Sequence, residues 1–261
     1  MPHGTPHESE KYLRLAAFTV GLRNKKVLEV GGCSPPSLLV GHAPRRWNCV
    51  NLDPKAVSAF NEQARDLDLK NYSAILQDAA TYEPDDSYDR IYSINAFEHI
   101  RDLCSALEKM RKALAPDGSL FTLFGPIWSS DVGHHLSIPG PNGPLTFADG
   151  ILAPWEHLTS TPDAIRAKLE RRYGRETADK AVEYIYHYPD LNRLLEDEYL
   201  ALVRDSGFFP TMVVRNRKGS PPPVAGAGRT REFAMILTKR RVPMLRQACY
   251  LLKFGWAYLR R

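Results

Sequence analysis

The chain has 261 residues and a formal net charge of +5, with 43% hydrophobic and 25% charged residues. This length fits one α/β domain with an insertion, and the composition is that of a globular protein, not of a disordered or fibrous one. Seven basic residues and no acidic ones lie between Lys239 and Arg261, so the rest of the chain has a formal charge of −2. A nearly neutral body does not favour nucleic acid as a partner, because a nucleic-acid-binding face is basic.

The cysteines and the N-terminus indicate a reduced, cytoplasmic protein. The four cysteines are too sparse for a disulfide framework, and none are paired at metal-ligand spacing. The first ten residues are polar, which does not resemble a secretory signal, and no apolar run reaches the ~18 residues of a membrane-spanning helix.

Strand and helix patterns alternate over the first 125 residues. Strands are predicted over 26–32, 49–54, 73–76, 88–95 and 119–124. Helices are predicted over 12–22, 37–40, 56–66 and 102–114, with a turn over 115–118. This alternation predicts a parallel sheet with helices on both faces.

The alternation breaks after residue 125. A region rich in turns, histidines and aromatic residues leads into a charged helical stretch over 163–186, and two more strands are predicted over 208–215 and 233–239. We therefore expect five parts: an N-terminal helix (1–24), a ligand-binding core (25–127), an inserted cap (128–205), the last two strands of the core (206–240) and a basic amphipathic C-terminal helix (241–261).

Acidic and glycine residues stand in and after three of the predicted strands. Glu29 is followed by Gly31 and Gly32, Asp53 ends the second strand, and Asp78 follows the third. Ligands of open parallel sheets bind at the carboxyl ends of the strands, where a carboxylate can accept hydrogen bonds from a ribose diol. Each residue also has a purely structural interpretation, as a turn glycine, a helix cap or a loop cap.

In this order, the residues resemble the class I S-adenosylmethionine-dependent methyltransferases over roughly residues 25–126. The segments 88–93 and 96–100, and the turn 114–120, match that family's fourth strand, the segment after it and the entry into strand five. The resemblance implies a seven-stranded, mostly parallel Rossmann-like sheet with a helical cap inserted after strand five, and S-adenosylmethionine as the cofactor. It implies cofactor-binding roles for Glu29, Gly31, Gly32, Asp53, Asp78, Ala79 and Asn95.

The glycine motif departs from the family pattern after its first glycine. Cys33 and Pro35 occupy positions where the family has glycine, so the Cys33 side chain must point away from the cofactor or narrow its pocket. This departure favours one alternative, a methyltransferase-like protein that binds a partner without catalysis. A dehydrogenase on a similar sheet is disfavoured, because its Gly-x-Gly-x-x-Gly fingerprint is missing.

Three histidines are candidates for a catalytic base. His99 follows the fourth strand, and His134 and His135 follow the fifth. A neutral imidazole can accept the proton that a hydroxyl loses as it attacks the methyl group. Asp131, His134 and His157 do not have a diagnostic metal spacing, so no metal site is predicted.

The predicted function is therefore methyl transfer to a small molecule, with a hydroxyl favoured over an amine as the acceptor. Aromatic residues of the cap, among them Tyr184, Tyr186 and Tyr188, either line the acceptor site or pack against the domain. An N-methyltransferase and an inactive binding protein are the alternatives, and an RNA methyltransferase is a weaker one.

The C-terminal segment 242–261 predicts an apolar helix with a narrow basic stripe. Arg246, Lys253 and Arg260 recur every seven residues among leucines and aromatic residues. Such a helix can dock on its own domain, pair with a second subunit in a homodimer, or lie on an anionic membrane surface.

Overall fold

The computed structural model describes residues 6–217, 224 and 227–259. The chain divides into two compact units. The first unit comprises residues 1–124, 201–214 and 234–261, and the second comprises residues 125–200 and 215–233. The basic residues Arg260 and Arg261 lie outside the described residues.

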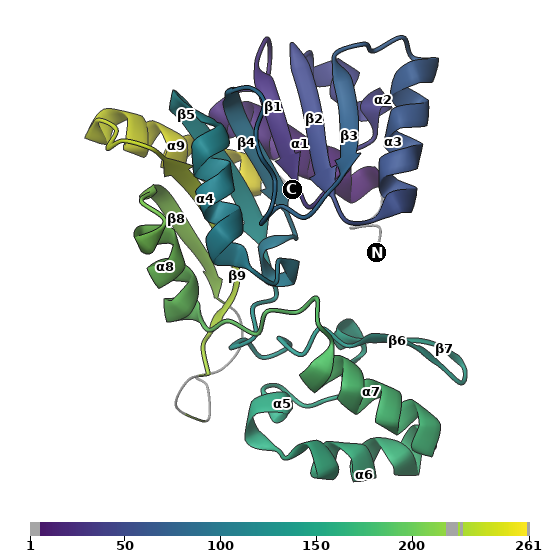
Figure 1. Ribbon diagram of the computed structural model, residues 1–261. Helices are drawn as coiled ribbons and strands as arrows, with labels where there is room; N and C mark the ends of the chain where they lie inside the picture. Colours follow the sequence, from purple (N-terminus) through teal and green to yellow (C-terminus); the bar gives the residue numbers. More distant parts are fainter. Residues whose placement is uncertain (1–5, 218–223, 225–226, 260–261) are drawn as a thin grey trace. The chain divides into compact units, whose positions relative to one another are not determined.

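A seven-stranded sheet organises the first unit (Figure 1). Its strands are β1 (Lys26–Val30), β2 (Arg46–Asn51), β3 (Tyr72–Leu76), β4 (Tyr88–Ile94), β5 (Leu114–Phe124), β8 (Phe209–Arg217) and β9 (Thr230–Thr238). They run in the order β3-β2-β1-β4-β5-β9-β8, and the first five are parallel. The predicted fold class, a mostly parallel Rossmann-like sheet with seven strands, is confirmed.

Helices connect the strands and cover both faces of this sheet. They are α1 (Pro6–Val20), α2 (Pro36–Leu39), α3 (Pro54–Asp66), α4 (Leu103–Ala113), α8 (Glu196–Asp205) and α9 (Met244–Leu259), with short 3-10 turns η1 (Val40–His42) and η2 (Phe97–His99). Asp53 and Asp102 cap α3 and α4, accepting hydrogen bonds from the N–H groups of Lys55 and Ser105. Both helices therefore begin where their sequences supply a side-chain acceptor.

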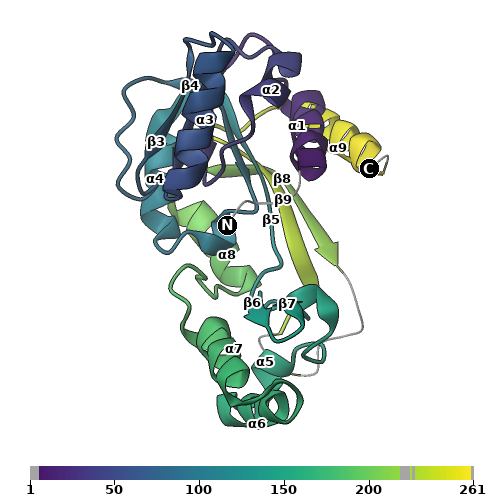
Figure 2. The same cartoon turned by 90° about the vertical axis from the view of Figure 1, so that its right-hand side faces the viewer.

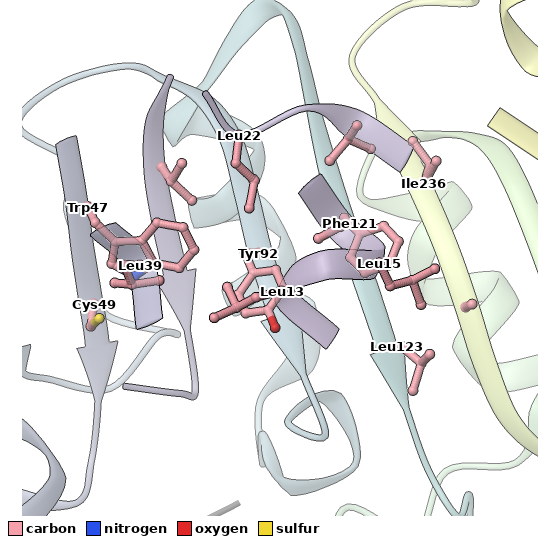
Figure 3. Packing of buried hydrophobic residues seen from close by; sticks show 14 of the residues in the cluster. Leu13, Leu15, Leu22, Leu39, Trp47, Cys49, Tyr92, Phe121, Leu123 and Ile236 are labelled. Carbon is pink, nitrogen blue, oxygen red and sulfur yellow. The ribbon is translucent and has the colours of Figure 1, made fainter. Parts of the chain in front are cut away.

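The core on one face of the sheet is built around aromatic residues of the central strands (Figure 3). Trp47 of β2, Tyr92 of β4 and Phe121 of β5 are all buried, and the last two stack with their ring centroids 6.5 Å apart. Leu13 of α1 packs into the same cluster. Burial of such large apolar side chains is the main stabilising term for the unit.

The turn predicted over residues 115–118 lies within the bounds of β5, which begins at Leu114. The pairing with β4 explains this difference, because Tyr88 stands opposite Leu114 whereas Arg90 stands opposite Ser119. Four residues of β5 thus oppose the single residue Asp89, so the turn residues form an irregularity inside the strand and do not precede it.

The C-terminal helix α9 docks on the first unit, which was one of the three open alternatives. Tyr250 and Phe254 are buried in the core cluster, and Phe254 lies 6.4 Å from the Phe121 ring. Trp256 stacks on Phe18 of α1 at 5.0 Å, and Figure 2 shows α1 and α9 side by side. One face of the helix is therefore used for packing.

A hairpin of strands and a pair of helices make up most of the second unit. They are β6 (Ser137–Gly140), β7 (Gly143–Thr146), the 3-10 turn η3 (Phe147–Asp149), α5 (Glu156–Thr159), α6 (Pro162–Tyr173) and α7 (Arg175–His187). The single helical stretch predicted over 163–186 is broken at Gly174, whose φ of +82° is costly for other residues. Ile165 and Leu169 of α6 pack against Ala181 and Ile185 of α7 in the unit's own core.

Candidate cofactor site and the histidine cluster

The carboxyl end of β1 passes into a turn that requires glycine. Gly31 has a φ of +80°, and its N–H donates to the Val50 carbonyl oxygen at 2.9 Å. A Cβ atom on Gly31 would lie 2.4 Å from the Cβ of Ala96, in the segment after β4. The backbone of this turn therefore approaches the neighbouring segment more closely than a side chain allows.

Glu29 holds the loop that follows the glycine turn. Its side chain is buried, and its carboxylate accepts the Ser34 N–H at 3.0 Å, the Ser34 hydroxyl at 2.8 Å and the Trp47 Nε1–H at 2.8 Å. Burial raises the pKa of Glu29, and the hydrogen bonds from Ser34 and Trp47 oppose that rise. Glu29 thus positions the loop around Gly31 and Gly32, and its partners Ser34 and Trp47 were not anticipated from the sequence.

Cys33 is half-buried and packs against the hydrophobic core of the first unit. Its sulfur lies 3.8 Å from the side-chain nitrogen of Asn51 at the end of β2. Of the two expectations for this departure from the glycine pattern, the contacts favour a side chain that is turned into the protein.

The two aspartates lie after neighbouring strands of the same sheet edge. Asn51 at the end of β2 pairs with Leu76 at the end of β3, so Asp53 and Asp78 follow strands that end in register. Asp53 Oδ1 accepts the Lys55 N–H at 2.9 Å, and Asp78 Oδ1 accepts the Ala80 N–H at 2.9 Å. Each aspartate therefore caps its own turn, and these local bonds fix the carboxylate at the sheet edge.

The segment after β4 contributes Asn95 and His99 to this edge. Asn95 has a φ of +47°, and its N–H donates to the Leu123 carbonyl oxygen at 2.8 Å. His99 ends the η2 turn and is half-buried. Phe97, two residues earlier, anchors this turn by packing against Phe124 at 5.2 Å.

The other two candidate bases, His134 and His135, belong to the second unit and are buried there. His134 Nδ1 accepts the Leu136 N–H at 3.2 Å, and His135 Nδ1 lies 3.0 Å from the Gly133 carbonyl oxygen. The His134 ring packs edge-on against His157 at 5.5 Å. Both side chains therefore make local contacts that order the loop after β5.

His157 and an ion pair complete the polar interior of this loop. His157 Nε2 lies 2.8 Å from the Trp128 carbonyl oxygen, and its buried Nδ1 has no hydrogen-bond partner among the described residues. Asp131 forms a salt bridge with Arg231 through both of its oxygens. The sequence did not predict Arg231 as a partner of Asp131. Because Asp131 is paired with this arginine, it is not available to bind a metal together with His134 and His157.

Burial lowers the pKa of His134 to about 3 and that of His157 to about 4. In the unfolded chain each imidazole has a pKa near 6.5 and binds a proton as the pH falls below that value. In the folded protein the two imidazoles bind protons only at a much lower pH. We therefore expect stability to fall as the pH is lowered from about 6.5 towards 4, by up to about 1.4 kcal/mol per pH unit for each histidine. Urea unfolding at several pH values, followed by tryptophan fluorescence, measures this slope.

His157→Gln is expected to flatten the slope, because glutamine can donate to the Trp128 carbonyl but does not titrate. His187→Gln, at an exposed position of α7, is the matched control and should leave the slope unchanged. An unaltered slope in His157→Gln would show that the acid sensitivity arises elsewhere.

The tyrosines of the cap are divided between two roles. Tyr184 and Tyr188 stack at 4.7 Å and line an open pocket of about 610 Å³, together with Arg166, Asp179 and other residues of the second unit. Burial and the neighbouring Tyr188 raise the pKa of Tyr184 to about 12, so it is a neutral phenol at physiological pH. Tyr186 donates instead to the His157 carbonyl oxygen at 2.9 Å and packs within the unit.

A family model described as a methyltransferase domain matches residues 7–139, slightly more than half of the chain. The chain belongs to the class I S-adenosylmethionine-dependent methyltransferases. Enzymes of this family use S-adenosylmethionine as the methyl donor, so the expected class of enzyme and cofactor are confirmed at the level of the family.

Two solved methyltransferases share the fold over most of their length. An S-adenosylmethionine-dependent methyltransferase from Mesorhizobium loti has a TM-score of 0.56 and 13% identity, covering 89% of this chain and 99% of that one. A protein from Listeria monocytogenes, described as a putative S-adenosylmethionine-dependent methyltransferase, has a TM-score of 0.54 and 14% identity. The match covers 90% of this chain and 100% of that one.

Plant N-methyltransferases are similar over shorter segments. A probable (S)-tetrahydroprotoberberine N-methyltransferase 2 of Papaver bracteatum is 32% identical over 99 residues, which cover 36% of this chain and 27% of that protein. The (S)-coclaurine N-methyltransferase of Thalictrum flavum subsp. glaucum is 37% identical over 62 residues, covering 24% and 17%. The matched segments thus span about a quarter or less of these relatives.

Proposed function

We propose that this methyltransferase binds S-adenosylmethionine at the carboxyl edge of β1 to β4 and methylates a small molecule. The observation that carries the proposal is the glycine turn at Gly31, held by Glu29 and followed along the sheet edge by Asp53 and Asp78. A closely packed glycine turn beside two fixed carboxylates suits a ligand with a sulfonium, a ribose diol and an adenine.

Each residue of the edge has a proposed role toward this cofactor. The turn of Gly31 and Gly32, which their missing Cβ atoms let pack against Ala96 and Glu29, contacts the methionine portion with its backbone. Asp53 accepts hydrogen bonds from the ribose hydroxyls, and Asp78 with Ala79 contacts the adenine. Asn95 closes the site from the end of β4. The bound cofactor supplies an activated methyl group, so the protein's own contribution is to orient the acceptor and exclude water.

An amine nitrogen is the first acceptor class to test. The named plant relatives are N-methyltransferases. An amine in its neutral form attacks the methyl group directly and can lose its proton to solvent afterwards, so no catalytic base is required. The lowered pKa of His134 and its bond to Leu136 make it a poor base, which removes part of the sequence argument for a hydroxyl.

A hydroxyl acceptor stays a prediction, with His99 as the base, because that residue lies at the proposed cofactor edge and is half-buried rather than buried. The two chemistries differ in what His99→Gln does. Transfer to an amine should persist at a similar rate, whereas transfer to a hydroxyl should fall by about 10²-fold or more.

The cofactor site is tested by calorimetric titration with S-adenosylmethionine and with its demethylated product, S-adenosylhomocysteine. Asp53→Asn keeps a good helix cap but removes the charge that would accept the ribose hydroxyls. We expect it to weaken binding by about tenfold or more, the value of a hydrogen bond to a charged group.

Asp102→Asn is the matched control, because Asp102 caps α4 in the same way. Equal binding by wild type and Asp53→Asn would contradict the ribose role. If the wild type binds the cofactor but forms no S-adenosylhomocysteine with any of a panel of small amines and phenols, the inactive binding protein becomes the better interpretation.

A further inference from the structure

The C-terminal helix α9 has a second apolar face opposite the one that packs on the domain. Tyr250 and Phe254 point into the core, whereas Leu245, Leu252 and Leu259 recur every seven residues on the other side. The term 'outer face of α9' is used for the residues Met244, Leu245, Ala248, Leu251, Leu252, Trp256 and Leu259.

This outer face is unusually exposed. Met244, Leu245, Leu252 and Leu259 are 75–87% accessible, and they are the four most exposed large hydrophobic side chains among the described residues. Phe18 of α1, 44% accessible and stacked on Trp256, extends the face onto the neighbouring helix. Single exposed leucines are common, but a continuous apolar row marks a surface that meets an apolar partner.

Basic residues border the outer face, and acidic ones are absent from this part of the chain. Arg246 and Lys253 are both exposed and lie one residue after Leu245 and Leu252, on one flank of the row. Arg240 and Arg241 precede the helix, and no acidic residue follows Glu232 in the sequence. The apolar row is complementary to an apolar layer, and the basic border is complementary to negative charges at the edge of that layer.

We propose that α9 lies on an anionic membrane surface, with its outer face in the boundary between headgroups and acyl chains. The 16 residues of the helix span about 24 Å, and no helix among the described residues is long and apolar enough to cross a membrane. Leucines and Trp256 enter the boundary while Arg246 and Lys253 contact lipid phosphates, which is the arrangement of interfacial helices.

A second copy of the chain suits this face less well. Two such helices packed together would bring their basic flanks near each other without acidic partners. A contact confined to helices of about 24 Å also falls below the roughly 1,200 Å² of a stable interface. The proposal concerns where the enzyme works, so it stands whether or not the proposed cofactor and acceptor roles hold.

Flotation of the full chain with vesicles tests the proposal. We expect binding to vesicles of equal parts phosphatidylglycerol and phosphatidylcholine, little binding to phosphatidylcholine alone, and release at high salt. The double variants Leu245→Glu/Leu252→Glu and Arg246→Glu/Lys253→Glu should each reduce the bound fraction by about tenfold or more.

Matched controls change two apolar or two basic residues at exposed positions elsewhere. Val40→Glu/Leu67→Glu and Arg171→Glu/Arg172→Glu should bind vesicles like the wild type. Circular dichroism should show that all variants fold, because the changed side chains are exposed and Arg246→Glu removes only one hydrogen bond among the described residues, from Arg246 to the Tyr250 hydroxyl. Failure of the wild type to float with anionic vesicles overturns the proposal. A concentration-dependent dimer that Leu245→Glu/Leu252→Glu dissociates, without vesicle binding, would replace it with self-association.

Discussion

Gly31→Ala is expected to abolish cofactor binding and to lower the melting temperature by about 5–10 °C. Two costs combine at this position. The backbone has a φ of +80°, which disfavours any side chain, and the new Cβ would lie 2.4 Å from the Cβ of Ala96. Relief requires the turn to move away from the segment after β4, and the turn is where the methionine portion of the cofactor is proposed to lie.

Gly41→Ala is the matched control for this substitution. Gly41 has no positive φ, and a Cβ there would meet no heavy atom within 4 Å. Calorimetry with S-adenosylmethionine and a thermal melt, run on both variants, separate the effects. Gly31→Ala protein that binds the cofactor like the wild type would show that this turn is not the binding element.

Glu29→Ala is expected to destabilise the first unit by about 2–4 kcal/mol, the cost of leaving several buried donors without an acceptor. The donors are the backbone N–H and hydroxyl of Ser34 and the indole N–H of Trp47. We also expect weaker cofactor binding, because Ser34 belongs to the loop that follows Gly31 and Gly32. Urea unfolding and calorimetric titration measure the two effects.

Glu29→Gln keeps the shape of the side chain and one acceptor oxygen, so its cost should be smaller. It should also remove a pH dependence. Since burial raises the pKa of Glu29, the contribution of this residue to stability falls as the pH rises through the folded pKa. Glu108→Ala, at an exposed position of α4, is the control and should leave stability nearly unchanged. Equal stability of Glu29→Ala and wild type would contradict the positioning role.

The histidine loop shows that a local sequence pattern leaves the role of its residues open. The sequence makes His134 and His135 candidates for a catalytic base after strand five, or residues of an ordered loop. In the structure both are buried in the second unit, and the His134 imidazole accepts a backbone N–H and packs on His157. The sequence holds no local signal for the contacts of this loop, because they join residues that are far apart in the chain. Asp131, for example, pairs with Arg231, one hundred residues away.

The sequence by itself determined the succession of strands and helices from α1 to β5 and the positions of the glycine turn and the two aspartates, but it did not indicate α8. These features follow from short-range rules: apolar runs make buried strands, an aspartate before Pro54 caps a helix, and Gly31 permits a positive φ.

Only the tertiary structure decided what surrounds these residues. It joined Glu29 to Ser34 and Trp47, broke the charged stretch at Gly174, and turned one face of α9 inward while leaving the other exposed. Such outcomes depend on side chains that meet across the fold. A linear pattern records how apolar a helix is, but not which of its faces the rest of the chain covers.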